Sequence, residues 1–269
     1  MHYKLISDLQ GNQQVDLQDR GFQYGDGLFE TMLLDNGEIK YWPEHYSRLY
    51  SSAKKLYISC PDKDWFEENL QGYIDLNLRL VIKIILTRGS GGRGLKLPEE
   101  SQANVYLLKY DSSKTTEYQQ VKAIFSEITL SKNRNLAGLK HLNRLDYVLA
   151  THQLKSRSQF NEALLLDDEG SIIESIINNF FFIKDGVVFT PSLETSGVDG
   201  IMRQLILKNL KQNGKAVKIG HYSKHDVVTA DECFLCNSVQ GISPVIQIED
   251  IKYKIGPITK DLQTKFHGH

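Results

Sequence analysis

Hydrophobic and polar positions follow two different periods along the chain, and these periods predict an ordered series of strands and helices. The strand-like stretch FETMLL at residues 29–34 leads through Asp-Asn-Gly at 35–37 into residues 38–42. Because Asn-Gly supplies the positive φ angles of a tight turn, this stretch predicts a β-hairpin. Pro43 then opens a helix over residues 44–56, since proline is favoured at the first helical position.

Two β-rich stretches follow, at residues 78–87 and 104–110, with RGSGGRG at 88–94 between them. The spacing of the glycines satisfies G-x-G-x-x-G, but a dinucleotide site also needs a helix directly after it. Pro98 and a further strand follow instead. The segment therefore predicts a flexible loop whose arginines are suited to binding an anion.

Residues 111–120 are polar and lack periodicity, which makes them the best candidate for a domain boundary. We expect a small N-terminal α+β domain at residues 1–112, a linker at 113–120 and a large C-terminal domain, which carries Lys140, at 121–269.

Strand patterns dominate the second half of the chain. Its predicted elements are a strand at 121–128, a helix with Leu142, Leu145, Val148 and Leu149 on one face, hairpins at 163–175 and 180–191, a helix from about 200 to 214, a strand at 232–236 and a turn at 237–245. Helices and strands in both halves predict two α+β domains.

The composition is that of a globular protein that can bury a sizeable core, with 269 residues, 41% of them hydrophobic. A net charge of −1, from 32 basic and 33 acidic residues, disfavours nucleic acid as the main partner. The N-terminus lacks the apolar segment of a signal peptide, and no run approaches the ~18 apolar residues that span a membrane. We therefore expect a cytoplasmic protein without a membrane partner.

Cys233 and Cys236 form the motif C-F-L-C, which raises the question of a redox or zinc site. The motif lies in a predicted strand, where residues three apart point to opposite faces, and no second pair exists. We therefore expect no metal.

Lys140 lies just upstream of the apolar helical stripe, and a surface lysine there would need no explanation. A lysine that binds pyridoxal phosphate covalently needs a phosphate cradle and a partner for the pyridine nitrogen. Glu174 ends an apolar strand, where a buried carboxylate needs a partner. Candidate phosphate contacts are the N–H groups of Ile201 and Met202 at a helix start, Arg48, and the turn residues Asn237 and Ser238. The alternative to a cofactor site is that Arg48 is a solvent-exposed helix residue and that Glu174 forms a salt bridge at the strand end.

Seven segments in a fixed order carry a family resemblance. They are DRGFQYGDGLFET at 19–31, EHYSRL at 44–49, RGSGGRG at 88–94, LAGLKHLNRL at 136–145, EALLLDDEGSIIES at 162–175, TPSLETSGVDGIMRQ at 190–204 and CNSVQGISPV at 236–245. With them the chain resembles the fold-type IV pyridoxal-phosphate enzymes, the class-IV aminotransferase family, over nearly its whole length. The resemblance implies an α+β fold with a smaller N-terminal α/β sandwich, a larger C-terminal pseudo-barrel, the cofactor in the cleft between them, and a homodimer.

The resemblance also implies a role for each candidate residue. Lys140 stands where the family has its Schiff-base lysine, Glu174 where a glutamate pairs with the pyridine nitrogen, and Arg48 where an arginine binds the phosphate. The remaining expected phosphate contacts are the amides of Ile201 and Met202 and the turn residues Asn237 and Ser238. Lys140 is therefore the expected catalytic amine.

Within the family, KHLNRL and the arginine-rich loop match the lyase branch, which converts 4-amino-4-deoxychorismate to 4-aminobenzoate and pyruvate on the way to folate. Arg93, flanked by glycines, is the expected contact to a substrate carboxylate. Arg88 is a second candidate, although its place at a strand end favours a structural role.

Three alternatives remain open. Branched-chain aminotransferases usually carry a tyrosine five residues after the lysine, where this chain has Leu145. D-amino-acid aminotransferases share the K-x-L-N pattern but are not expected to carry R-G-x-G-G-R-G. A non-enzymatic pyridoxal-phosphate carrier would keep the cradle without turnover.

Overall fold

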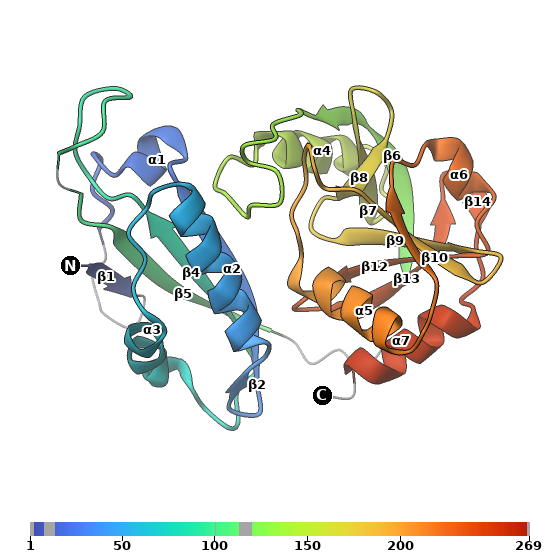
Figure 1. Cartoon of the computed structure of the whole chain (residues 1–269), viewed down its shortest axis with the longest axis horizontal. Coiled ribbons are helices and arrows are strands. Elements are labelled where there is room, and N and C mark those ends of the chain that lie inside the picture. Colours follow the sequence, from blue (N-terminus) through green and yellow to red (C-terminus); the bar gives the residue numbers. More distant parts are fainter. Residues whose placement is uncertain (1–2, 8–13, 100, 113–119, 268–269) are drawn as a thin grey trace. The chain divides into compact units, whose positions relative to one another are not determined.

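The computed structural model describes residues 3–7, 14–99, 101–112 and 120–267 (Figure 1). The chain forms two compact units. The first comprises Met1–Lys114 and Lys140–Asn143, and the second comprises Thr115–Leu139 and Arg144–His269. Residues 113–119 of the predicted linker lie outside the described part of the chain.

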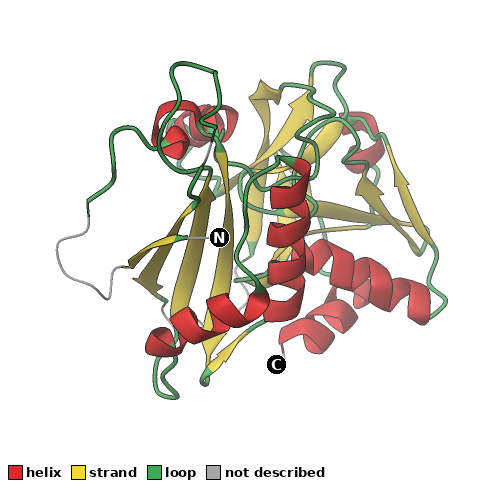
Figure 2. Cartoon of the chain, turned by 60° about the vertical axis from the view of Figure 1, so that its left-hand side comes forward, coloured by secondary structure: helices red, strands yellow, loops and turns green. Residues whose placement is uncertain are grey.

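The first unit is a mixed sheet with helices against it. Its described strands are β1 (Lys4–Ser7), β2 (Gly27–Asp35), β3 (Glu38–Ile39), β4 (Leu80–Thr87) and β5 (Asn104–Asp111), in the order β1-β5-β4-β2-β3. Its helices are α1 (Arg20–Tyr24), α2 (Trp42–Lys55), α3 (Lys63–Leu70) and the 3-10 turn η1 (Gln71–Tyr73). Helix α2 packs against β2, and both are labelled in Figure 1; Figure 2 distinguishes the helices of the chain, in red, from its strands, in yellow.

The hairpin expected after residue 29 is confirmed. Asn36 and Gly37 have φ angles of 53° and 77°, and Leu34 pairs with Ile39. The second strand is shorter than expected because Tyr41 adopts a left-handed conformation and α2 begins at the next residue. The chain therefore passes from the short strand β3 through Tyr41 directly into α2.

The second unit is built on a larger sheet. Its described strands are β6 (Val121–Leu130), β7 (Glu162–Asp167), β8 (Ile172–Ser175), β9 (Asn179–Lys184), β10 (Val187–Pro191), β11 (Val217–Gly220), β12 (Glu232–Asn237), β13 (Gly241–Ile248) and β14 (Ile251–Lys252). Their order is β11-β10-β9-β12-β13-β6-β7-β8, with β14 beside β13. The end strand β8 also lies close to β9, and Ile172 donates its N–H to the Tyr222 carbonyl at 2.7 Å. The sheet therefore curls back on itself.

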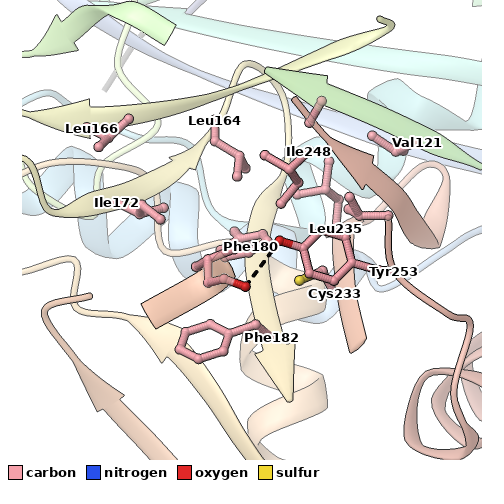
Figure 3. Packing of buried hydrophobic residues seen from close by; sticks show 13 residues of the cluster. Val121, Leu164, Leu166, Ile172, Phe180, Phe182, Cys233, Leu235, Ile248 and Tyr253 are labelled. Atoms are coloured by element: carbon pink, nitrogen blue, oxygen red, sulfur yellow. Dashed lines mark hydrogen bonds between the residues drawn. The ribbon is translucent and has the colours of Figure 1, made fainter. Parts of the chain in front are cut away.

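Four helices accompany this sheet in the described residues: α4 (Leu145–Lys155), α5 (Ile201–Gln212), α6 (Lys224–Val228) and α7 (Pro257–His267). Helix α4 contacts β6 and β7, α5 contacts β12, and α7 contacts β13. The inner side of the sheet holds an aromatic core in which Phe182 stacks on Phe189, with ring centroids 4.8 Å apart. Figure 3 shows this core, where the Tyr253 hydroxyl donates to the Val227 carbonyl at 3.1 Å.

The helix expected from Leu142 begins instead at Leu145, and its apolar face is exposed. Residues 140–142 cannot be helical because they pair with β2: the N–H of Phe29 donates to the Lys140 carbonyl, and that of Leu142 to the Gly27 carbonyl. Leu145 is 77% exposed, and the buried side of α4 is formed around Ala150. The leucine spacing therefore predicted a helix correctly, but Leu142 lies before its start and the face that carries Leu145, Val148 and Leu149 is exposed.

In the part of the chain that the structure describes, no helix combines the length and apolar character needed to cross a membrane.

Candidate active site

Lys140 is fixed to the first unit by backbone pairing with β2. The bridge between Leu28 and His141 holds this short segment at the start of the strand. The Lys140 ammonium lies 4.3 Å from the centroid of the Phe29 ring. Because an aromatic face attracts a cation, this contact helps to orient the Lys140 side chain. These backbone hydrogen bonds fix the position of the Lys140 Cα atom relative to β2.

Glu174 lies near the end of β8 and is buried, with 3% of its surface exposed. One carboxylate oxygen, Oε1, accepts from the Tyr147 hydroxyl at 2.5 Å. The other, Oε2, accepts from Asn179 Nδ2 at 3.1 Å and from the Val198 N–H at 3.0 Å. These donors hold the carboxylate in place. A carboxylate can also accept from a cationic N–H group, which forms a stronger hydrogen bond than a neutral donor does.

Helix α5 begins beside this carboxylate. Gly200 caps the helix without a side-chain hydrogen bond, and Ile201 and Met202 form its first turn. The first N–H groups of a helix have no carbonyl partner within it, and the helix dipole favours an anion there. A Cβ atom on Gly200 would lie 2.0 Å from Asn179 Oδ1. Asn179 thus touches both Glu174 and the cap of α5, and the structure brings these two predicted features together.

The predicted turn after β12 joins the same region through paired asparagines. Asn237 donates from Nδ2 to Asn178 Oδ1 at 2.7 Å, and its own Oδ1 accepts from the Gln240 N–H. Asn178 in turn donates to Glu162, and burial raises the pKa of that carboxyl. Ser238 is half-buried in this turn. Since Asn178 and Asn179 are neighbours, the turn is tied to the strand end that also holds Glu174.

Arg48 is held by a buried carboxylate in the first unit. Its Nε and Nη2 atoms donate to Glu30 at 2.8 and 2.6 Å, and His45 Nδ1 lies 2.6 Å from the same carboxylate. Burial raises the pKa of Glu30, but the charges of Arg48 and His45 outweigh it and lower this pKa to about 2. Glu30 therefore stays ionised and fixes the orientation of the Arg48 guanidinium.

The arginines of the RGSGGRG loop have different environments. Arg88 donates to Asp26 from Nε and Nη2 at 2.8 and 2.9 Å, and to the carbonyls of Tyr57 and Leu56. This environment supports a structural role for Arg88. Arg93 is exposed and lies between two glycines with positive φ angles.

Arg20 fixes the far side of the same loop. It pairs with Asp26 and donates from Nη1 to the Gly94 carbonyl at 3.0 Å. Both ends of the loop are thus anchored to Asp26, and Arg93 lies between the anchors.

The residues of the second unit fit the ring nitrogen and the phosphate of pyridoxal phosphate. The second unit offers a buried carboxylate for the ring nitrogen and a helix start whose cap bears no side-chain hydrogen bond. Ser196 Oγ and Thr195 Oγ1, in the segment before α5, are buried and have no hydrogen-bond partner among the residues that the structure describes. Such polar groups are suited to an additional acceptor such as a phosphate oxygen.

The fold and these groups define a class of protein. Residues 27–248 match the model of the Amino-transferase class IV family, so the chain belongs to that family.

Individual members of the family show which enzymes the chain is similar to. The chain is 34% identical over 260 residues to the aminodeoxychorismate lyase of Vibrio harveyi, covering 93% of this chain and 94% of that protein. It is 33% identical over 260 residues to a putative branched-chain-amino-acid aminotransferase of Methanocaldococcus jannaschii, covering 94% and 90%. The crystal structure of 4-amino-4-deoxychorismate lyase from Pseudomonas aeruginosa matches with a TM-score of 0.83 and 31% identity, covering 96% of each chain.

Sequence reasoning missed Tyr147, Asn179 and Glu30. Glu30 lies in a buried strand two positions from apolar neighbours on each side, which is a signal for a paired carboxylate. Tyr147 and Asn179 carry no such signal, because their contacts with Glu174 join segments 27 and 5 residues away.

Proposed function

We propose that this chain is a pyridoxal-phosphate-dependent lyase that converts 4-amino-4-deoxychorismate to 4-aminobenzoate and pyruvate. The relative from Vibrio harveyi and the matching crystal structure from Pseudomonas aeruginosa both support this reaction. The structural observation that carries it is the RGSGGRG loop, whose ends are anchored by Arg20 and Arg88 and whose exposed cation is Arg93. A substrate with two carboxylates needs such a cation.

The candidate residues would each make one kind of contact with the cofactor. Lys140 would hold the cofactor covalently through Nζ, Glu174 would hold a proton on the ring nitrogen, and Arg48 would bind the phosphate. The remaining phosphate contacts would come from the N–H groups of Ile201 and Met202 and from Asn237 and Ser238. Bound in this way, the cofactor supplies an electron sink conjugated to the substrate amine.

Lys140 Nζ moves the protons of the reaction. With cofactor and substrate bound, the Lys140 amine would accept the proton from the ring carbon that bears the substrate nitrogen. The bond between the ring and the oxygen of the enolpyruvyl arm then breaks. Lys140 returns a proton to the departing group, which leaves as pyruvate, while the ring becomes aromatic.

An aminotransferase is the second candidate, supported by the relative from Methanocaldococcus jannaschii. It would use the same cofactor residues but would need a keto acid as a second substrate. Leu145, at the position where branched-chain aminotransferases usually carry a tyrosine, begins α4 as an exposed residue. This position therefore offers no hydroxyl to such a reaction.

The expected homodimer and cytoplasmic location remain predictions. A dimer could cover the apolar surface of α4 around Leu145, Val148 and Leu149. Light scattering of the purified protein would test the dimer.

Borohydride reduction tests the covalent attachment. Reduction of the cofactor-loaded protein should fix a pyridoxyl group on the peptide that contains Lys140, and mass spectrometry would locate it. Label on Lys83, a half-buried lysine near the same Phe29 ring, would show that the wrong amine has been chosen.

A further inference from the structure

Tyr147 contacts Glu174 from the inner side of α4. Its hydroxyl donates to Glu174 Oε1 at 2.5 Å, the short distance typical of a hydrogen bond to an ionised acceptor. Burial, followed by the charge of Glu174, raises the pKa of Tyr147 well above its usual value. The phenol therefore remains protonated, and a hydrogen-bond donor, at neutral pH.

The surroundings fix the Tyr147 ring. Tyr147 packs against the core cluster that contains Ala150 of α4 and Ile173, the residue before Glu174. The Arg144 guanidinium lies 4.9 Å from the centroid of the Tyr147 ring, and its Nη2 donates to the Leu139 carbonyl at 3.1 Å. The contacts thus run from the peptide that precedes Lys140, through Arg144 and Tyr147, to Glu174.

We propose that Tyr147 is a positioning residue that keeps Glu174 oriented and ionised, and thereby keeps the cofactor ring nitrogen protonated. The inference rests on the proposed role of Glu174. None of the motifs that identify the family includes Tyr147 in a functional role, and the inference comes from its contact with Glu174 alone.

The sign of the effect follows from proton affinity. A donor on a carboxylate stabilises its charged form, so removing the donor makes the carboxylate a stronger base. The proton shared with the ring nitrogen then shifts towards Glu174. A neutral ring is a poorer electron sink, so the chemical step slows while the phosphate contacts remain.

The test is the ¹⁵N chemical shift of the ring nitrogen in protein loaded with ¹⁵N-labelled pyridoxal phosphate. Wild type should show a protonated ring nitrogen, and Tyr147→Phe should shift towards the neutral value, with Glu174→Gln as the reference for a neutral ring. Tyr253→Phe is the matched control, because it removes another phenol hydrogen bond of the second unit, to the Val227 carbonyl. This control should keep the wild-type shift.

Kinetics provide a second readout. Tyr147→Phe should lower kcat about 10-fold, the factor expected for a lost hydrogen bond to a charged group, with little change in KM. A fully protonated ring nitrogen in Tyr147→Phe would overturn the inference and leave the proposed function intact. A neutral ring nitrogen in wild type, or no cofactor binding, would instead overturn the role of Glu174 or the proposed function, and the inference with it.

Discussion

Glu174 illustrates what a buried carboxylate requires from its neighbours. In the sequence, Glu174 follows two apolar residues at the end of a predicted strand. Apolar strand residues indicate a covered part of a sheet, so the burial of Glu174 could be predicted. Its donors could not be predicted: Tyr147 comes from α4 and the Val198 N–H from the loop before α5. Such contacts depend on how the sheet curls, which no local pattern encodes.

Replacing Glu174 with glutamine should leave the cofactor bound and lower kcat by about 100-fold or more, because a charge aimed at the reacting system is removed. Steady-state kinetics with saturating cofactor would measure this. Glu232→Gln is the control: Glu232 is also a buried carboxylate of the second unit, but it accepts from the N–H groups of Ile258 and Thr259 at the start of α7. Glu232→Gln should cost about 1 kcal/mol of stability and leave kcat unchanged. Near-normal turnover in Glu174→Gln would make Glu174 a structural residue.

At the scale of elements, the start of α5 was predictable and the start of α4 was not. Gly200 and the apolar residues after it indicate a helix start that could receive an anion, and α5 begins at Ile201. The leucines near Lys140 indicate a helix from Leu142, but backbone pairing with β2 keeps that residue extended. A helical period shows which residues share a face. It does not show whether the first of these residues pair with a strand from elsewhere in the chain.

Gly200→Ala tests the contact between α5 and the carboxylate. A Cβ atom there would meet Asn179 Oδ1, displace Asn179 from Glu174 and disturb the helix start. We expect cofactor affinity to fall about 10-fold or more, measured by titrating the apoprotein with pyridoxal phosphate. Gly256→Ala introduces a similar clash, 2.1 Å from the Glu232 carboxyl carbon, before α7. It should lower stability and spare affinity, and equal losses of affinity in both variants would remove the α5 start from the site.

At the scale of the whole molecule, the chain leaves the second unit at Lys140 and returns to it at Arg144. The order of elements follows from the strand and helix signals along the chain. The assignment of Lys140–Asn143 to the first unit does not, because it rests on pairing with β2, which lies more than a hundred residues earlier in the chain. The molecule thus holds its proposed catalytic amine on the same unit as Arg48 and the RGSGGRG loop.

The loop should act on the substrate and not on the cofactor. Arg93→Ala should lower kcat/KM at least ~10-fold, equivalent to ~1.4 kcal/mol, while cofactor affinity persists. Arg93→Lys should recover part of the loss, because a lysine keeps the charge but loses the planar fork. Lys55→Ala, which removes an exposed cation at the end of α2, controls for the net charge of the unit. Unchanged kinetics in Arg93→Ala would exclude this side chain from the substrate site.

Product analysis with purified protein, pyridoxal phosphate and 4-amino-4-deoxychorismate tests the proposed lyase reaction most directly. Without any added keto acid, the protein should release 4-aminobenzoate and pyruvate in equal amounts and over many turnovers. Release that stops after one turnover, or that requires a keto acid acceptor, would contradict the lyase and identify an aminotransferase.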